Sequence, residues 1–218
     1  MRQAPRRLRH AVLARLIVLL IALAAGPMAL AAQSGQGDMP ALGQEASGHV
    51  LRGRFVQHKH LAELDRALVS RGHYVVARNR GLLWQVDKPV HSTLVITPQS
   101  LTESSQGQQT AHISAQQQPA LGAVASILLA VFQGNTDQLS RYFKIQRPDQ
   151  DSSGKTLTLT PRTDAVKHFI TRLKISGGDS VRRIRIDQPG GDYSIIDLHP
   201  AQHTAKALTP AERRAFAR

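Results

Sequence analysis

The residues from Phe55 to Thr97 constrain the fold most strongly, because they alternate apolar runs with turn residues. The runs are Phe55–Gln57, Gly72–Trp84 and Leu94–Thr97, and they are rich in Val, Ile, Leu and aromatic residues. Asn-Arg-Gly interrupts the second run and Asp-Lys-Pro follows it. Period-two runs separated by such residues indicate successive antiparallel strands joined by short turns. No acid, base or nucleophile clusters here, so this sheet is more typical of a container than of an enzyme.

The N-terminus predicts export. Five arginines between Arg2 and Arg15 precede the apolar run Leu16–Ala25, and Ala29-Leu30-Ala31 follows as a small-residue cleavage site. This order predicts a signal peptide over residues 1–32, with a mature chain that begins near Ala32. The alternative is a retained membrane anchor, but the run is shorter than the ~20 residues that a span needs, and Gly26-Pro27 breaks it.

Composition limits the remaining possibilities. The chain has no cysteine, so packing without disulfides must hold an exported fold together. The net charge of +13 falls to +8 without the leader arginines, because 23 Lys and Arg then face 15 Asp and Glu. The densest basic cluster, Arg182-Arg183-Ile184-Arg185, alternates with isoleucine as in a strand with one wet face. We therefore expect attraction to anionic lipid or to an acidic partner, and no nucleic acid.

The rest of the chain also reads mostly as sheet. Further strands are predicted over 155–160, 168–175, 181–187 and 192–198, and 110–114 is a candidate edge strand. Gly177-Gly178-Asp179 and Pro189-Gly190-Gly191 separate the last three as hairpin turns that favour positive φ. Residues 33–48, rich in Gly, Gln and Ser, are predicted to be a loose leader. This antiparallel pattern disfavours a fold built from parallel crossovers.

One helix stands between the two sheet halves. Pro119–Phe132 is free of charge, with Pro at a plausible first helical position and Gly134 as a stop signal. It is apolar on all sides and too short to span a membrane, which is typical of a helix buried on both sides. It is either a core helix under the sheet or a lid that closes an apolar cavity. A second short helix, capped by Asn135 or Thr136, is predicted to run through Phe143.

These segments, in this order, resemble the LolA-type periplasmic carriers of outer-membrane lipoproteins. The most specific part is Phe55-x-Gln57 followed by Gly72–Trp84, Pro89 and Leu94–Thr97, and Leu157–Pro161 adds weaker support. The resemblance implies an α+β fold, an incomplete antiparallel β-barrel (half-barrel) with a helical lid over an apolar cavity, spanning residues 49–218. It also implies a periplasmic carrier of acylated lipoprotein or other lipid cargo. Two features depart from the better-known members and indicate a divergent branch. They are the Gln-rich segment Gln106–Gln118 and a C-terminal capping box at Thr209–Glu212.

The resemblance and the apolar pattern together give a set of candidate site residues. Arg78 matches the family's functional arginine in the turn before the tryptophan strand, whereas Arg80 is an unmatched extra. Arg78 would tether the lid or the cargo headgroup, and the alternative is a solvated cation at a strand end. The acyl-cavity and lid candidates, each of which could instead be ordinary core, are Phe55, Tyr74, Val76, Arg78, Leu82, Trp84, Leu94, Ile96, Val124, Leu128 and Phe132.

An enzyme is the competing class. His58-x-His60 would place two imidazoles on one strand face, but no third ligand stands at a suggestive spacing. The sequence has no Gly-x-Ser-x-Gly, phosphate-loop or His-Glu-x-x-His motif, which leaves a hydrolase assembled in space as a less favoured reading. We expect no catalytic residues, no cofactor and no metal. The expected partners are an inner-membrane donor complex and an outer-membrane acceptor, and the expected state is a monomer. The nearer alternative is a carrier of a free acyl chain or a lipid-linked pigment.

Overall fold

The computed structural model describes residues 50–77, 80–116, 119–133, 135–146, 150–151, 154–177, 180–201, 205 and 207–217. The predicted signal peptide and leader, Arg78, Gly134 and the Gly178-Asp179 pair lie outside these ranges. The side chain of Val124 is also outside the described set, although its backbone belongs to a helix.

The described residues form one antiparallel sheet of twelve strands. We call its first half the first wing: β1 (Val50–His60), β2 (Leu68–Ala77), β3 (Gly81–Lys88), β4 (Ser92–Ile96), β5 (Ser100–Ser105) and β6 (Gln108–Ser114). The second wing holds β7 (Phe143–Gln146), β8 (Gln150–Asp151), β9 (Gly154–Pro161), β10 (Arg172–Gly177), β11 (Val181–Asp187) and β12 (Tyr193–Pro200). The wings join where β1 pairs with β12.

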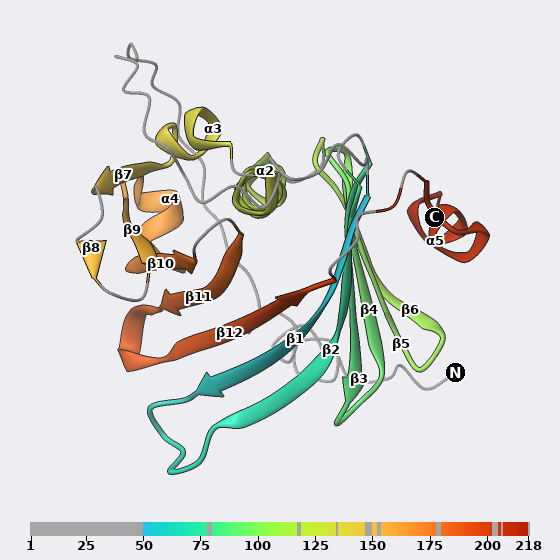
Figure 1. Cartoon of the computed structure of the whole chain (residues 1–218), viewed down its shortest axis with the longest axis horizontal. Helices are drawn as coiled ribbons and strands as arrows, with labels where there is room; N and C mark the ends of the chain where they lie inside the picture. The colour runs from blue at the N-terminus through green and yellow to red at the C-terminus, as the bar shows by residue number, and fades with distance from the viewer. Residues whose placement is uncertain are drawn as a thin grey trace, which may run out of the picture.

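The sheet curves without closing. Its strand order runs β6-β5-β4-β3-β2-β1-β12-β11-β10-β9-β7, with β8 paired to β9, so β6 forms one free edge and β7 and β8 lie along the other. Figure 1 shows the wings diverging from the β1–β12 seam, and we call the region that their facing surfaces bound the trough. This confirms the predicted incomplete antiparallel barrel, including the edge strand over 110–114, which lies within β6.

Helices occupy opposite sides of the first wing. α2 (Pro119–Gln133) lies in the trough between the wings, whereas α5 (Pro210–Phe216) packs on the other side of the first wing (Figure 1). α2 therefore begins at the predicted proline and ends one residue beyond the predicted Phe132. Two short helices, α3 (Thr136–Ser140) and α4 (Asp164–Lys167), border the second wing, and a single 3₁₀ turn, η1 (Pro189–Gly191), joins β11 to β12.

Two predicted boundaries are wrong. α3 begins after Asn135, whose side chain accepts a hydrogen bond from the Gln138 amide as predicted, but it ends at Ser140, and Phe143 opens strand β7. The strand predicted from His168 begins only at Arg172, because helix α4 precedes it, with Thr163 as its N-cap and His168 as its C-cap. Both errors have one cause: a helix of four or five residues is too short to show a helical period in sequence.

The hairpin at Pro189–Gly191 follows the expected chemistry. Gly190 and Gly191 adopt φ values of 82° and 91°, which side chains other than glycine rarely accept. The predicted capping box at the C-terminus is also present: the Thr209 hydroxyl accepts from the Glu212 amide, and the Glu212 carboxylate accepts from the Thr209 amide.

The two faces of the first wing carry separate hydrophobic clusters. The large inner cluster fills the trough and includes residues of both wings and of α2, such as Trp84, Phe132 and Ile196. The small outer cluster lies under the C-terminal segment and is built from Val50, Val75, Ala77, Leu83, Val95 and Leu208. Because successive strand residues point to opposite faces, the apolar stretches of β2 and β3 supply both clusters at once.

Candidate functional site

The inner face of the first wing is organised in three cross-strand rows. The first row is Leu51, Val76, Leu82, Ile96 and Leu101. The second row is Gly53, Tyr74, Trp84, Leu94 and Glu103. The third row is Phe55, Gly72, Val86, Ser92 and Ser105. The first row is wholly aliphatic, the second is mostly aromatic and aliphatic but ends in a carboxyl group, and the third ends in two serines.

Gly72 allows aromatic rings from non-adjacent strands to meet. Phe55 on β1 and Trp84 on β3 stack with ring centroids 3.7 Å apart and planes 22° apart. Gly72 stands between them on β2, where a Cβ atom would lie 2.9 Å from the Phe55 ring and 1.9 Å from the Gln85 carbonyl oxygen. No larger residue fits without moving the backbone. The missing side chain on the central strand therefore creates a continuous aromatic surface.

Gly53 likewise leaves room for the Tyr74 ring. A Cβ atom on Gly53 would lie 2.4 Å from the Tyr74 hydroxyl oxygen, so the phenol ring occupies the space that a side chain on β1 would fill. Tyr74 is fully buried, and its ring lies 6.2 Å from Trp84 and 5.6 Å from Phe132. Burial raises the pKa of this hydroxyl well above its ordinary range, while the charge of Arg182 acts in the opposite direction.

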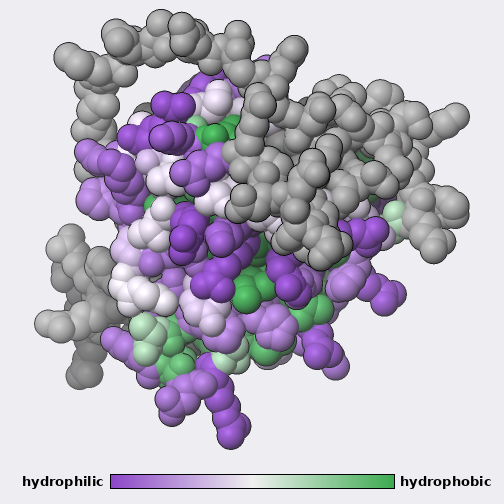
Figure 2. Space-filling view, turned by 60° about the vertical axis from the view of Figure 1, so that its left-hand side comes forward, coloured by the Kyte–Doolittle hydropathy of each residue, from purple (hydrophilic) through white to green (hydrophobic). Residues whose placement is uncertain are grey.

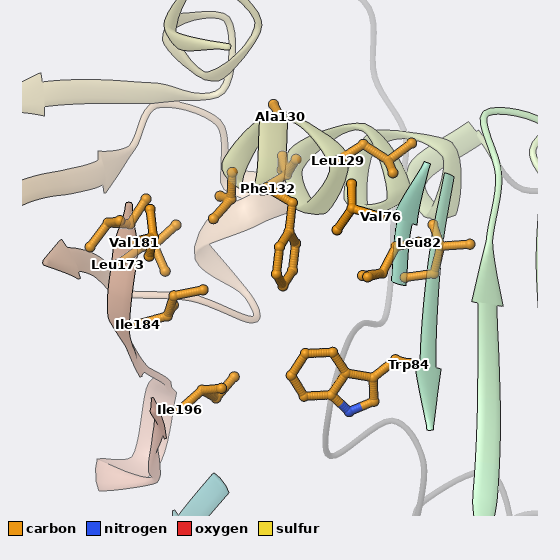
Figure 3. Packing of buried hydrophobic residues seen from close by; sticks show 14 of the residues in the cluster. Val76, Leu82, Trp84, Leu129, Ala130, Phe132, Leu173, Val181, Ile184 and Ile196 are labelled. Carbon is orange, nitrogen blue, oxygen red and sulfur yellow. The ribbon is translucent and has the colours of Figure 1, made fainter. Parts of the chain in front are cut away.

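Helix α2 closes this surface from the trough side. Figure 3 shows Phe132 projecting from α2 between the wings, with Trp84 beneath it and Ile184 and Ile196 of the second wing opposite. Leu129 lies above Val76 and Leu82 in the same view, so the aliphatic row is the one nearest the helix (Figure 3). The Trp84 and Phe132 rings meet edge-on, with centroids 6.2 Å apart.

Most of the predicted site residues lie in this one interior. Eight are buried members of the inner cluster: Phe55, Tyr74, Val76, Leu82, Trp84, Leu94, Ile96 and Phe132. Leu128 is half-buried and packs against that cluster, whereas Val124 belongs to α2 without a described side chain. Arg78 lies outside the described residues. The interior is packed with these side chains, so in this conformation the helix belongs to the core.

Sequence reasoning missed buried polar residues on the inner side of the sheet, among them Gln57, Lys59 and Glu103. Gln57 and Lys59 continue the inward alternation of β1 beyond Phe55, and Glu103 ends the second row; each is less than one-tenth exposed. The Lys59 ammonium lies 3.4 Å from the Gln188 side-chain oxygen, and burial lowers its pKa against the attraction of Asp192. Period-two counting from Phe55 would have placed Gln57 and Lys59 here. The inner face thus changes from apolar to polar along β1.

Burial also affects Glu103. Its pKa is raised by desolvation, and a 2.7 Å hydrogen bond from the Thr110 hydroxyl partly offsets that rise. Thr110 belongs to the edge strand β6, so this bond helps to fasten the edge to β5.

The outer face is held differently. Arg52 donates two hydrogen bonds to the Glu212 carboxylate, at 2.8 and 2.6 Å, and a third to the Ala207 carbonyl at 3.2 Å. Arg213 donates to the Leu208 carbonyl at 2.7 Å. The Arg52 hydrogen bond lowers the pKa of Glu212, with burial opposing it. Polar contacts therefore anchor α5 to β1.

The remaining polar candidates show no catalytic arrangement. His60 stacks on Tyr193 with centroids 4.3 Å apart, and the described residues contain no cluster of three or more potential metal ligands around His58 and His60. The face in Figure 2 is mostly hydrophilic, with hydrophobic atoms visible at its centre and lower margin. None of the helices in the described part of the chain is long and apolar enough to cross a membrane.

The described residues thus form an open antiparallel half-barrel whose apolar inner face packs against a charge-free helix. The chain belongs to the LolA family: residues 47–211 match the family model for the outer membrane lipoprotein carrier protein LolA. The description of that family is of a carrier protein for outer-membrane lipoproteins.

Solved structures with a similar chain course include relatives of low sequence identity. A LolA superfamily protein from Nitrosomonas europaea is 10% identical, with a TM-score of 0.45 over 82% of this chain and 94% of that one. A DUF1329 family protein from Desulfovibrio piger is 11% identical, with a TM-score of 0.43 over 77% and 90%. These scores are low, so membership rests on the sequence match. A search of curated proteins found no match.

Proposed function

We propose that the mature protein is a periplasmic carrier that shelters the acyl chains of lipoproteins inside the half-barrel and passes them to the outer membrane. The observation that carries this proposal is the pairing of an aromatic and aliphatic inner face with a helix, α2, that has no charged side chain. Family membership supports the same activity. The signal peptide over residues 1–32 and the carrier domain over 49–218 are part of the proposal.

The energetics of the cargo require such an interior. An acyl chain exposed to water costs about 0.8 kcal/mol per methylene, so a lipoprotein tail in the periplasm needs an apolar cover. The described conformation fills that space with its own side chains, Phe132 among them. Loading therefore requires α2 to move outward, so that acyl methylenes replace the helix against the aliphatic row. Return of the helix would expel the cargo without an energy source such as ATP.

Arg78 remains a proposed participant. The family resemblance gives it the tethering role, although it lies outside the described residues. Arg80 is a matched control because it is an exposed turn residue whose amide donates to the Ala77 carbonyl at 3.0 Å. Arg78→Leu should change loading or release without a comparable change in the urea unfolding curve, whereas Arg80→Leu should change neither. Loading and release are measured as the rate at which a bound lipid or lipoprotein passes to acceptor membranes. Equal rates for the parent, Arg78→Leu and Arg80→Leu would leave Arg78 as a solvated cation.

The interior itself is tested by binding of an environment-sensitive acyl probe to the mature protein. Leu128→Asp should weaken binding at least tenfold, because it places an unpaired carboxylate beside the inner cluster. Leu64→Asp is the matched control, since Leu64 is 49% exposed. The circular dichroism of both variants should stay sheet-like. Undiminished binding by a folded Leu128→Asp protein would contradict a site under α2.

The cargo is tested separately by mass spectrometry of whatever co-purifies with protein isolated from its host's periplasm. An acylated protein or peptide supports the lipoprotein role and predicts transfer from an inner-membrane donor complex to an outer-membrane acceptor. A free acyl chain or a lipid-linked pigment would instead identify a carrier of another hydrophobic molecule and overturn the lipoprotein assignment.

A further inference from the structure

Two polar groups in the aromatic interior have no hydrogen-bond partner among the described residues. The Tyr74 hydroxyl and the Trp84 indole nitrogen are both buried, and neither forms a hydrogen bond within the part of the chain that the structure describes. Tyr74 is 0% exposed and Trp84 is 5% exposed. Buried polar groups in folded proteins are nearly always paired, because an unmade bond leaves their desolvation uncompensated. Two such groups therefore require an explanation.

The two residues that carry these groups are neighbours on adjacent strands. Tyr74 and Trp84 are directly opposed cross-strand partners in the second row, and their rings lie 6.2 Å apart at an angle of 18°. Gly53 and Gly72 leave open the space on β1 and β2 that these rings use. The indole nitrogen lies on the edge of the ring remote from Phe132 in the view of Figure 3. Neither polar group thus forms a hydrogen bond that holds α2 in place.

The rows on either side give the site a direction. The aliphatic first row lies nearest α2, and the opposite direction along β1 leads to Phe55, then to the buried polar residues Gln57 and Lys59. An amphiphile that follows this gradient places its methylenes along the first row and its polar end towards Gln57. The group between chain and headgroup then falls at the second row. In acylated molecules that group is a carbonyl.

We propose that the Tyr74 hydroxyl and the Trp84 indole N–H bind the carbonyl oxygen that joins an acyl chain to its headgroup. This inference rests on the proposed carrier function and specifies its ligand: an acyl ester or amide rather than any hydrophobic molecule. The chemistry fits, because both protein groups can donate and a carbonyl oxygen carries two lone pairs that accept. The loaded state therefore satisfies two donors that the empty state leaves unpaired.

The pair also sets selectivity. A hydrocarbon in the same trough offers no acceptor, and a simple alkyl ether offers only its weaker ether oxygen, so neither ligand pairs the two donors as a carbonyl oxygen does. Sites built with hydrogen-bonding groups reject analogues that lack the matching group more strongly than apolar pockets reject small changes in size.

The test compares two synthetic ligands that share chain length and glycerol headgroup, a monoacylglycerol ester and its alkyl ether analogue. Each displaces an environment-sensitive acyl probe from the mature protein. We expect the parent to bind the ester about tenfold more tightly than the ether. Tyr74→Phe, which removes only the hydroxyl, should weaken ester binding much more than ether binding, so that the preference falls by at least threefold.

Tyr193→Phe is the matched control. Tyr193 stacks on His60 and lies under the Arg185 guanidinium, 4.1 Å from the ring centroid, and should keep the parent preference. Equal ester and ether affinity in the parent, or an unchanged preference in Tyr74→Phe, would overturn the carbonyl site while leaving the carrier intact. Failure of both ligands to bind would instead overturn the proposed function itself.

Discussion

Helices α5 and α2 cover opposite faces of the same wing, and they are held by different forces. α5 is tied to β1 by the two-pronged Arg52–Glu212 ion pair, across 160 residues of sequence. A capping box between Thr209 and Glu212 closes the N-terminus of α5 itself. α2 has only two polar side chains, Ser126 and Gln133, and contributes Ala125, Ile127 and Phe132 to the inner cluster.

This difference explains how one helix can be fixed while the other is exchangeable. Directional hydrogen bonds to a charged partner lose their energy when the partner moves, and they cannot be replaced by an arbitrary ligand. Apolar burial is non-directional and roughly proportional to area, so acyl methylenes can replace helix side chains against the same surface. The inner face therefore suits an exchange of occupants, and the outer face suits a permanent cover.

The largest expected effect concerns the inner helix. Phe132→Ala should lower the free energy of unfolding by about 3–5 kcal/mol, as measured by urea denaturation, because Phe132 touches Tyr74 and Trp84 in the closed core. Phe216→Ala on α5 is the control and should cost much less, since Phe216 only partly packs against the outer cluster. Equal costs would contradict the idea that the inner core depends on this helix.

A change of opposite sign is expected for Tyr74. Tyr74→Phe should raise the free energy of unfolding of the empty protein by about 1–2 kcal/mol, because it removes a buried hydroxyl without a partner. Tyr193→Phe should not stabilise. A stability loss in Tyr74→Phe would mean that the hydroxyl already has a hydrogen-bond partner in the closed state, such as an ordered water.

A smaller and strictly local effect is expected on the outer face. Arg52→Ala should cost roughly 1 kcal/mol, since a half-buried two-pronged pair is worth more than a typical surface pair but remains near water. Hydrogen exchange should speed up in α5 and leave α2 unchanged, and acyl-probe affinity should equal that of the parent. Loss of acyl binding in this variant would contradict the claim that contacts on the outer face do not affect binding at the inner face.

The smallest effect is a pH dependence confined to α5. The pKa of Glu212 is lowered from its ordinary value of 4.5, chiefly by the Arg52 hydrogen bond. The folded state therefore takes up the proton less readily than the unfolded state. The ionised Glu212 carboxylate therefore contributes its full stabilisation above pH 4.5. This contribution is lost as the pH falls through the lower pKa that Glu212 has in the folded state. NMR shifts of α5 amides should follow this titration in the parent and not in Glu212→Gln.

Local sequence patterns predicted the elements better than their contacts. Period-two runs located β2, β3 and β4, and the Thr209-x-x-Glu212 pattern located α5. The pairing of Arg52 with Glu212 is invisible in sequence, because it depends on where the folded chain brings two distant segments together. α4 was missed because its single turn gives no period.

The apolar candidate residues were predicted as a group, and their role in binding stays a prediction. Apolar residues of the strands and of α2 were identified as lining one interior, and the structure brings eight of them into one cluster. Sequence could not show that Gly72 lets Phe55 stack on Trp84, since that contact skips a strand. It also could not show that the Tyr74 hydroxyl would be left without a partner, because a tyrosine on a strand normally finds one.

The exchange of α2 for an acyl chain is tested most directly through Trp84, the single tryptophan of the chain. Its fluorescence reports on the aromatic surface beneath Phe132, and a brominated acyl chain quenches only on close approach. The account predicts that a brominated acyl ester quenches Trp84 saturably, while the α5 amide signals stay unchanged. Saturable binding of the same lipid without quenching of Trp84 would place the site elsewhere and contradict the account.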